Sequence, residues 1–80
     1  MLLIKLFAKA REIVGRPTIE FAWEDGQSVL TLKRRLAEQY PDLVPLLPRL
    51  LVAINNDYAA DDATVRSSDD VACFPPVSGG

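Results

Sequence analysis

The 80-residue chain contains no histidine and only one cysteine, Cys73. Without histidine it cannot form Ser-His or Cys-His nucleophilic pairs or a histidine metal site. A lone cysteine excludes an internal disulfide and the paired-cysteine motifs of redox and zinc sites. Neither GxGxxG nor GxxxxGK[ST] occurs, so no nucleotide-binding loop is visible. We therefore expect no metal site, no bound cofactor and no self-contained active site, which argues against an enzyme that is catalytic alone.

The net charge and the lengths of the hydrophobic runs restrict the kinds of partner that the protein can bind. The chain contains nine Lys and Arg residues and eleven Asp and Glu residues, which gives a formal net charge of -2. It therefore has no broad basic field to attract nucleic acid. No apolar stretch is long enough to cross a bilayer. The first expected strand begins beside Met1 and leaves no space for a secretory leader. We expect a cytoplasmic protein that binds neither nucleic acid nor membrane.

The composition is that of one globular domain, because 49 % of the residues are hydrophobic and 25 % are charged. Residues 2–8 begin the chain with an alternating strand pattern, and a second strand follows Pro17. Further extended segments are expected at residues 50–54 and 70–74, with shorter ones near residues 58–59 and 64–65. In the first strand, parity separates a core-facing set from an outward set: Leu2, Ile4 and Leu6 against Leu3, Lys5 and Phe7.

One clear helix is expected from about residue 29 to residue 40, with Ser28 as its N-cap. Its apolar residues recur at helical spacing and form a single stripe: Val29, Leu32, Leu36 and Tyr40. A shorter helical turn before Gly15 is indicated by Ala10, Ile13 and Val14. Prolines at 41, 45 and 48 should keep residues 41–49 from extending the helix or joining a sheet.

These elements predict an α+β fold in which one main helix packs on one face of a mixed sheet, and β-grasp is the best-known example at this size. The opposite face would stay partly open to solvent or to a partner. Parity sends Phe7 and Phe74 to that face beside Lys5, where two exposed aromatics suit a docking patch. We expect the partner-binding residues to be Phe7, Arg11, Tyr58, Phe74 and Pro75. The alternative is that loops cover the rings.

Two other features have ordinary structural interpretations. Cys73 shares the parity of Val71 in the last strand and is expected to be an inert core residue. The acidic pairs at 61–62 and 69–70 point to opposite sides of an extended chain, so they are expected to solvate turns.

The chain ends in Val77-Ser78-Gly79-Gly80, which we take as a flexible tail of residues 77–80 after a domain of residues 1–76. Pro75 and Pro76 fix the exit direction, and four further residues reach about 14 Å at most. Gly79 would let the tail enter a narrow channel. The Gly80 carboxylate is ionised at neutral pH, so it would need activation by ATP on another protein. The competing interpretation is a frayed end.

Residues 70–80, DVACFPPVSGG, resemble the ending of the small molybdopterin synthase subunits, the MoaD family. The segments Ile4–Ala8 and Ala10–Gly15 are similar to that family's first strand and turn, and Leu51–Asn55 to its middle strand. Cys73 stands where an aromatic residue is usual, and Ser68 where a glycine often precedes the acidic pair. Neither departure touches the tail.

The resemblance implies a ubiquitin-like sulfur carrier subunit of molybdopterin synthase. Its Gly80 would be adenylated by an E1-like activating enzyme that uses ATP and then converted by a sulfur donor to a thiocarboxylate. The tail of Val77, Ser78 and Gly79 would enter the large synthase subunit and give sulfur to cyclic pyranopterin monophosphate. A heterotetramer of two small and two large subunits is also implied.

Three alternatives stay open on the sequence. The protein could serve as a sulfur carrier for another pathway, such as thiamine or tungsten cofactor synthesis. It could be a ubiquitin-like modifier whose Gly80 forms isopeptide bonds with lysines. It could also be a plain interaction module with an idle tail.

Overall fold

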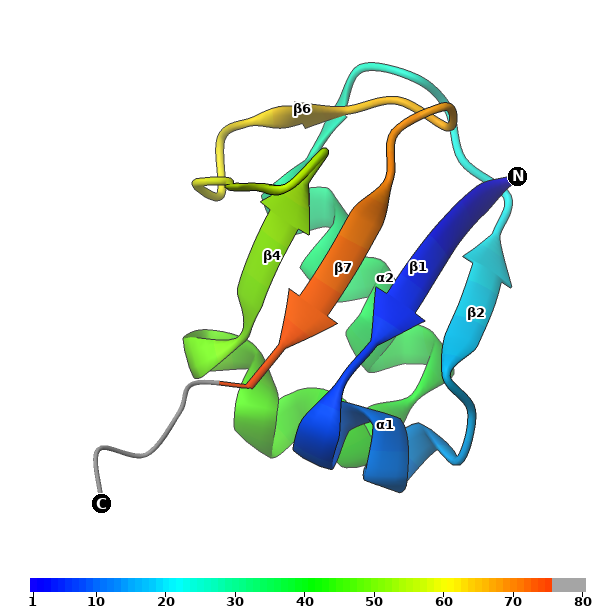
Figure 1. Cartoon of the computed structure of the whole chain (residues 1–80), viewed down its shortest axis with the longest axis vertical. Coiled ribbons are helices and arrows are strands. Elements are labelled where there is room, and N and C mark those ends of the chain that lie inside the picture. The colour runs from blue at the N-terminus through cyan, green and yellow to red at the C-terminus, as the bar shows by residue number, and fades with distance from the viewer. Residues whose placement is uncertain (76–80) are drawn as a thin grey trace.

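The computed structural model describes residues 1–75, and its fold is a five-stranded mixed sheet with helices against one face. Figure 1 shows α2 (Val29–Gln39) behind the central strands of the sheet. The strand order is β2-β1-β7-β4-β5, with strands β1 (Leu2–Leu6), β2 (Thr18–Phe21), β4 (Leu51–Ile54), β5 (Asp57–Tyr58) and β7 (Val71–Phe74). β7 is parallel to β1 and antiparallel to β4, while β2 and β5 are antiparallel edge strands. This arrangement, with a helix packed on one face, confirms the expected β-grasp class.

The central strands are amphipathic, and their parity agrees with the sequence. In β1, Leu2, Ile4 and Leu6 are buried while Leu3 and Lys5 are exposed. In β7 the buried residues are Val71 and Cys73. Successive side chains of a strand point to opposite faces, so each strand gives one set to the core and the other to the open face.

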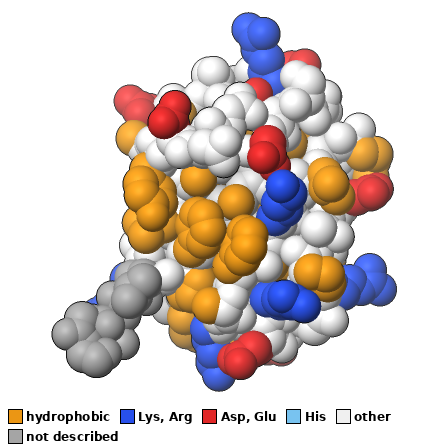
Figure 2. Space-filling view, in the orientation of Figure 1, with side chains coloured by type: hydrophobic (Ala, Val, Ile, Leu, Met, Phe, Trp, Pro, Cys, Tyr) orange, Lys and Arg blue, Asp and Glu red, His pale blue; other side chains and the backbone are white. Residues whose placement is uncertain are grey.

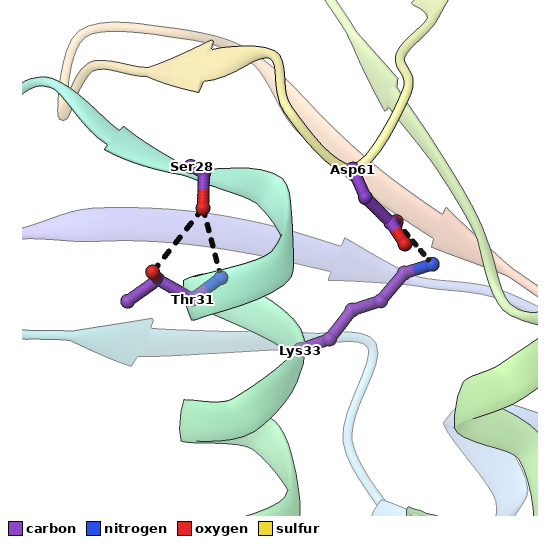
Figure 3. Close-up of polar contacts among 4 residues, drawn as sticks. All are labelled: Ser28, Thr31, Lys33 and Asp61. Atoms are coloured by element: carbon purple, nitrogen blue, oxygen red, sulfur yellow. Dashed lines mark hydrogen bonds and ion pairs between the residues drawn. The ribbon is translucent and has the colours of Figure 1, made fainter.

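The core-side layer is formed mainly by α2 (Val29–Gln39), which the apolar stripe predicted. Its buried residues are Val29, Leu32 and Leu36. Ser28 is the N-cap, because the Thr31 backbone N–H donates to its Oγ at 3.2 Å (Figure 3). Lys33 also holds the helix to the loop before β6 through an ion pair of 2.9 Å with Asp61 (Figure 3).

The proline-rich segment differs from the expectation. Residues Pro41–Arg49 do not continue α2 as an α-helix, but they form a 3-10 helix, η1, rather than an irregular loop. The fixed φ of proline, near −65°, lies within the range of a 3-10 helix. All three prolines are exposed, and Leu43 is buried in the core. The missing N–H groups therefore limit this helix without preventing it.

Two further elements differ from the sequence prediction: one strand was not predicted, and one helix begins earlier than expected. The short strand β3 (Gln27–Ser28) pairs with β6 (Thr64–Val65) in a separate two-stranded ribbon at the start of α2. The helical turn before Gly15 begins earlier than expected, as α1 (Ala8–Val14), and ends on Gly15 at φ 83°. Ala8 itself has φ 52°, so the chain turns sharply from β1 into α1. None of the helices in residues 1–75 has the length and apolarity to span a membrane.

Cys73 is fully buried in the core cluster, as expected from its parity. Burial raises the pKa of its thiol to about 12. Because the thiolate is the reactive form, on the order of one thiol in ten thousand is ionised at pH 8.

We therefore predict that the native protein resists alkylation by iodoacetamide at pH 8, while the urea-unfolded protein reacts at the rate of a free thiol. Intact-mass analysis of the labelled fraction over time measures both rates. Stoichiometric labelling of the folded protein within minutes would contradict the buried, protonated thiol.

Candidate functional site: an aromatic cluster at the end of β7

Three aromatic side chains meet on the sheet face that the helices do not cover, and we call Phe7, Tyr58 and Phe74 the aromatic cluster. The rings of Phe7 and Phe74 stack with centroids 5.1 Å apart and an interplanar angle of 21°. Tyr58 meets Phe74 edge to face at 6.3 Å and 75°. Both geometries are favoured aromatic pairings, so the rings hold one another in place.

The sheet register brings the cluster together from three distant parts of the sequence. Leu6 and Cys73 are partners in the parallel pairing of β1 and β7, so Phe7 and Phe74 follow side by side. The Phe7 N–H donates to the Cys73 carbonyl at 3.2 Å and extends that pairing by one bond. Tyr58 arrives from β5, next to β4.

The cluster is open to solvent. Phe7 is 42 % exposed and Tyr58 is 76 % exposed, so loops of residues 1–75 do not cover these two rings. Figure 2 shows hydrophobic side chains gathered on this face over the neighbouring strands. The exposed Leu51 of β4, the register partner of Phe74, enlarges the apolar area. A contiguous exposed apolar patch on a small domain is typical of a protein-interaction surface.

A shallow hollow of about 260 Å³ lies against the cluster, and its polar side is formed by an ion pair. The Lys5 ammonium lies 3.2 Å from an Asp70 carboxylate oxygen, and both side chains are about half exposed. Exposed pairs of this kind add only about 0–1 kcal/mol to stability. The ion pair of Lys5 and Asp70 therefore places charges at the edge of the apolar patch but contributes little to the stability of the fold.

The sequence pattern identified the aromatic residues but missed parts of the surface around them. Asp70 was expected only to solvate a turn, whereas it pairs across the sheet with Lys5. Leu51 lies in the extended segment expected at residues 50–54, and it is exposed opposite Phe74 in the β4–β7 pairing. Strict alternation from buried Val52 would have placed Leu51 on the open face.

The remaining predicted site residues have different positions. Arg11 is exposed on α1. Among residues 1–75, it does not line the hollow beside the aromatic cluster, and it does not line the second hollow, which lies at Pro75. Pro75 is partly buried immediately after β7. Val77, Ser78, Gly79 and Gly80 lie outside the described residues, as does Pro76 at the expected domain boundary. Their expected roles stay predictions.

The described part of the chain offers no set of side chains suited to hold a metal: residues 1–75 contain no cluster of three or more His, Cys, Asp or Glu groups. No buried side-chain polar atom in the same residues lacks a hydrogen-bond partner. An orphaned buried polar atom would have pointed to a ligand.

Known proteins resemble the chain over nearly its full length. The molybdopterin synthase sulfur carrier subunit of Dictyostelium discoideum is 36 % identical and matches 96 % of this chain and 93 % of its own. The protein of the same name from Escherichia coli K12 is 35 % identical, with all of both chains covered. Among solved structures, small archaeal modifier protein 1 of Haloferax volcanii has a TM-score of 0.82 and 26 % identity, with 95 % of this chain and 97 % of that chain covered.

The model of the ThiS family matches residues 4–80, which includes the terminal glycines. A match of this extent, together with relatives more than 30 % identical along their whole length, establishes the family. The chain belongs to the ThiS family.

Proposed function

We propose that this protein is the sulfur carrier subunit of a molybdopterin synthase and delivers sulfur from a thiocarboxylate at Gly80. The observation that carries the proposal is the full-length match to relatives of that name, with the chain ending in Gly79-Gly80. The open aromatic cluster at the end of β7 supports it, because a carrier must dock on other proteins.

The carrier cycle begins with an ionised carboxylate, which is a poor acyl donor. An E1-like activating enzyme would join a carboxylate oxygen of Gly80 to the α-phosphorus of ATP, with pyrophosphate leaving. Sulfide (HS⁻) supplied by a sulfur donor would then attack the acyl carbon; the new carbon–sulfur bond replaces the bond to AMP, which leaves, and Gly80 becomes a thiocarboxylate. The large synthase subunit would use that sulfur on cyclic pyranopterin monophosphate.

This chain's own contribution is to bind and to position. β7 is hydrogen-bonded to β1 on one side and to β4 on the other, so the strand that leads to the tail is anchored along both edges. Phe74 is the last residue of that strand. A partner that covers the aromatic cluster therefore lies beside the root of the tail, and its active site can receive Gly80.

Because this chain binds and positions while other proteins carry out the chemistry, the proposed function also implies which surfaces the partners would contact. The large subunit would cover Phe7, Tyr58 and Phe74, with Pro75 at the tail and Arg11 at the rim, in a complex of two small and two large subunits. The chain would hold no cofactor, because ATP is bound by the activating enzyme. Because the cycle depends on ATP, we place it in the cytoplasm.

Deletion of Gly80 tests the carrier role. The shortened chain still ends in glycine, but its acyl carbon stops about 3.5 Å short of the original position. We expect the variant to bind the large subunit with unchanged affinity and to lose nearly all sulfur transfer. The measurement is molybdopterin formation from thiocarboxylated carrier, large subunit and pyranopterin precursor. Full transfer by the shortened chain would refute the role of Gly80.

Phe74→Ala tests the docking surface. Removing this ring also frees Phe7 and Tyr58, so we expect association with the large subunit to weaken by about 2 kcal/mol or more, the range of an interface hot spot. Titration calorimetry measures the affinity, and circular dichroism checks the fold. Leu30→Ala, which truncates an exposed apolar residue on α2 rather than on the open sheet face, is the control and should bind normally. Equal affinities for the two variants would contradict the assignment.

A second function is favoured by one observation, the likeness to a small archaeal modifier protein. A modifier would form isopeptide bonds between Gly80 and lysines of other proteins. Intact-mass spectrometry of the protein from its native cells separates the two functions. We expect free chains with one oxygen replaced by sulfur, whereas lysine conjugates in place of that species would indicate a modifier.

A further inference from the structure

A second hollow lies where the tail leaves the domain, and it has no part in the site described above. This tail-root groove has a volume of about 660 Å³ and runs between the start of α1, η1 and the residue that precedes the undescribed tail. Its walls are mostly apolar, with a cation from each helix: Pro45, Leu46, Pro48, Pro75, Lys9 and Arg49.

The groove is a preformed feature of the fold. Two of its wall residues, Pro45 and Pro48, have a fixed φ within the 3-10 helix η1. Leu46 packs against the core cluster. The groove is therefore available without reorganisation of the chain, and its volume is within the range of about 300–1,000 Å³ typical of binding pockets.

The two cations make the groove positively charged, although the chain as a whole carries a negative net charge. The chain as a whole carries a net charge of -2, yet Lys9 and Arg49 face one groove without an acidic lining residue. Lys9 has only a long, exposed contact of 3.8 Å with Glu12. No carboxylate of residues 1–75 forms an ion pair with Arg49.

The location of the groove at the start of the tail indicates which protein would cover it. Pro75 is both a wall of the groove and the last described residue before the tail. A protein that takes Gly80 into its active site has to surround the tail close to its root. Burial of Lys9 and Arg49 beneath such a protein without a counter-charge would be costly.

We propose that the tail-root groove binds a segment of the large synthase subunit that carries apolar side chains and at least one carboxylate. This inference rests on the proposed function, and it adds a charged contact site distinct from the aromatic cluster. The five residues after Pro75 span about 17 Å when extended. A tail extended into a partner's active site would hold Gly80 away from these cations, so we assign the counter-charge to the partner's carboxylates.

Charge reversal tests the groove in the full-length protein. Arg49→Glu and Lys9→Glu should each weaken binding to the large subunit at least tenfold in 50 mM salt, and the difference from the unchanged protein should shrink in 500 mM salt. Titration calorimetry at the two salt concentrations measures this. Arg49→Gln removes the charge without placing an anion at the end of η1, and it should weaken binding to a smaller extent.

The matched control is Arg66→Glu, which reverses an exposed cation just after β6 at the opposite end of the sheet from α1 (Figure 1). It changes the net charge equally, so it should bind as the unchanged protein does if the groove is a specific contact. Circular dichroism and thermal melts check the fold of each variant.

The outcomes separate this inference from the proposed function. Normal binding by both Arg49 variants and by Lys9→Glu, with Phe74→Ala still weakened, overturns the groove and leaves the carrier function intact. An equal loss in Arg66→Glu also overturns the groove, because only net charge would then matter. No binding by the unchanged protein overturns both proposals.

Discussion

The parallel pairing of β1 with β7 is the interaction on which the rest of the molecule depends. It joins the two ends of the described chain in the middle of the sheet, and its register sets Phe7 beside Phe74. The same pairing buries Ile4 and Val71 against the helices. A slip of β7 by one residue against β1 would exchange the two faces of β7 and turn Phe74 toward the core. Core and docking surface are therefore fixed by the same hydrogen bonds.

This dependence explains how a domain of 80 residues supports a reactive terminus. The buried side chains of β7 lie on one face of the strand, and the outward-facing side chains lie on the other, within a strand of four residues. The strand ends at Phe74, so the aromatic cluster is adjacent to the point where the tail begins. Under the proposed function, docking on the aromatic cluster would bring the partner beside the start of the tail.

Much of this could be predicted from the sequence because it follows from short periodic patterns. Alternation in β1 and β7 placed the core and the open face correctly, and the spacing of Val29, Leu32 and Leu36 defined α2. The strand β3 was missed because Gln27 and Ser28 are polar and gain a strand only by pairing with β6, 36 or more residues away. The 3-10 helix was missed because proline was judged as a breaker of α-helices, whereas its φ suits the tighter turn.

The tail-root groove lay beyond any sequence pattern. Lys9 and Arg49 are far apart in the chain, and only the packing of α1 against η1 brings them to one groove beside Pro75. Under the proposed function, an activating enzyme and the synthase take the same tail in turn, so both would approach over this end of β7 and could not bind together. Each complex must then be able to dissociate. A patch that combines stacked aromatics with exposed charges suits such exchange, because charged contacts at a rim influence association rates and salt dependence more than they add affinity.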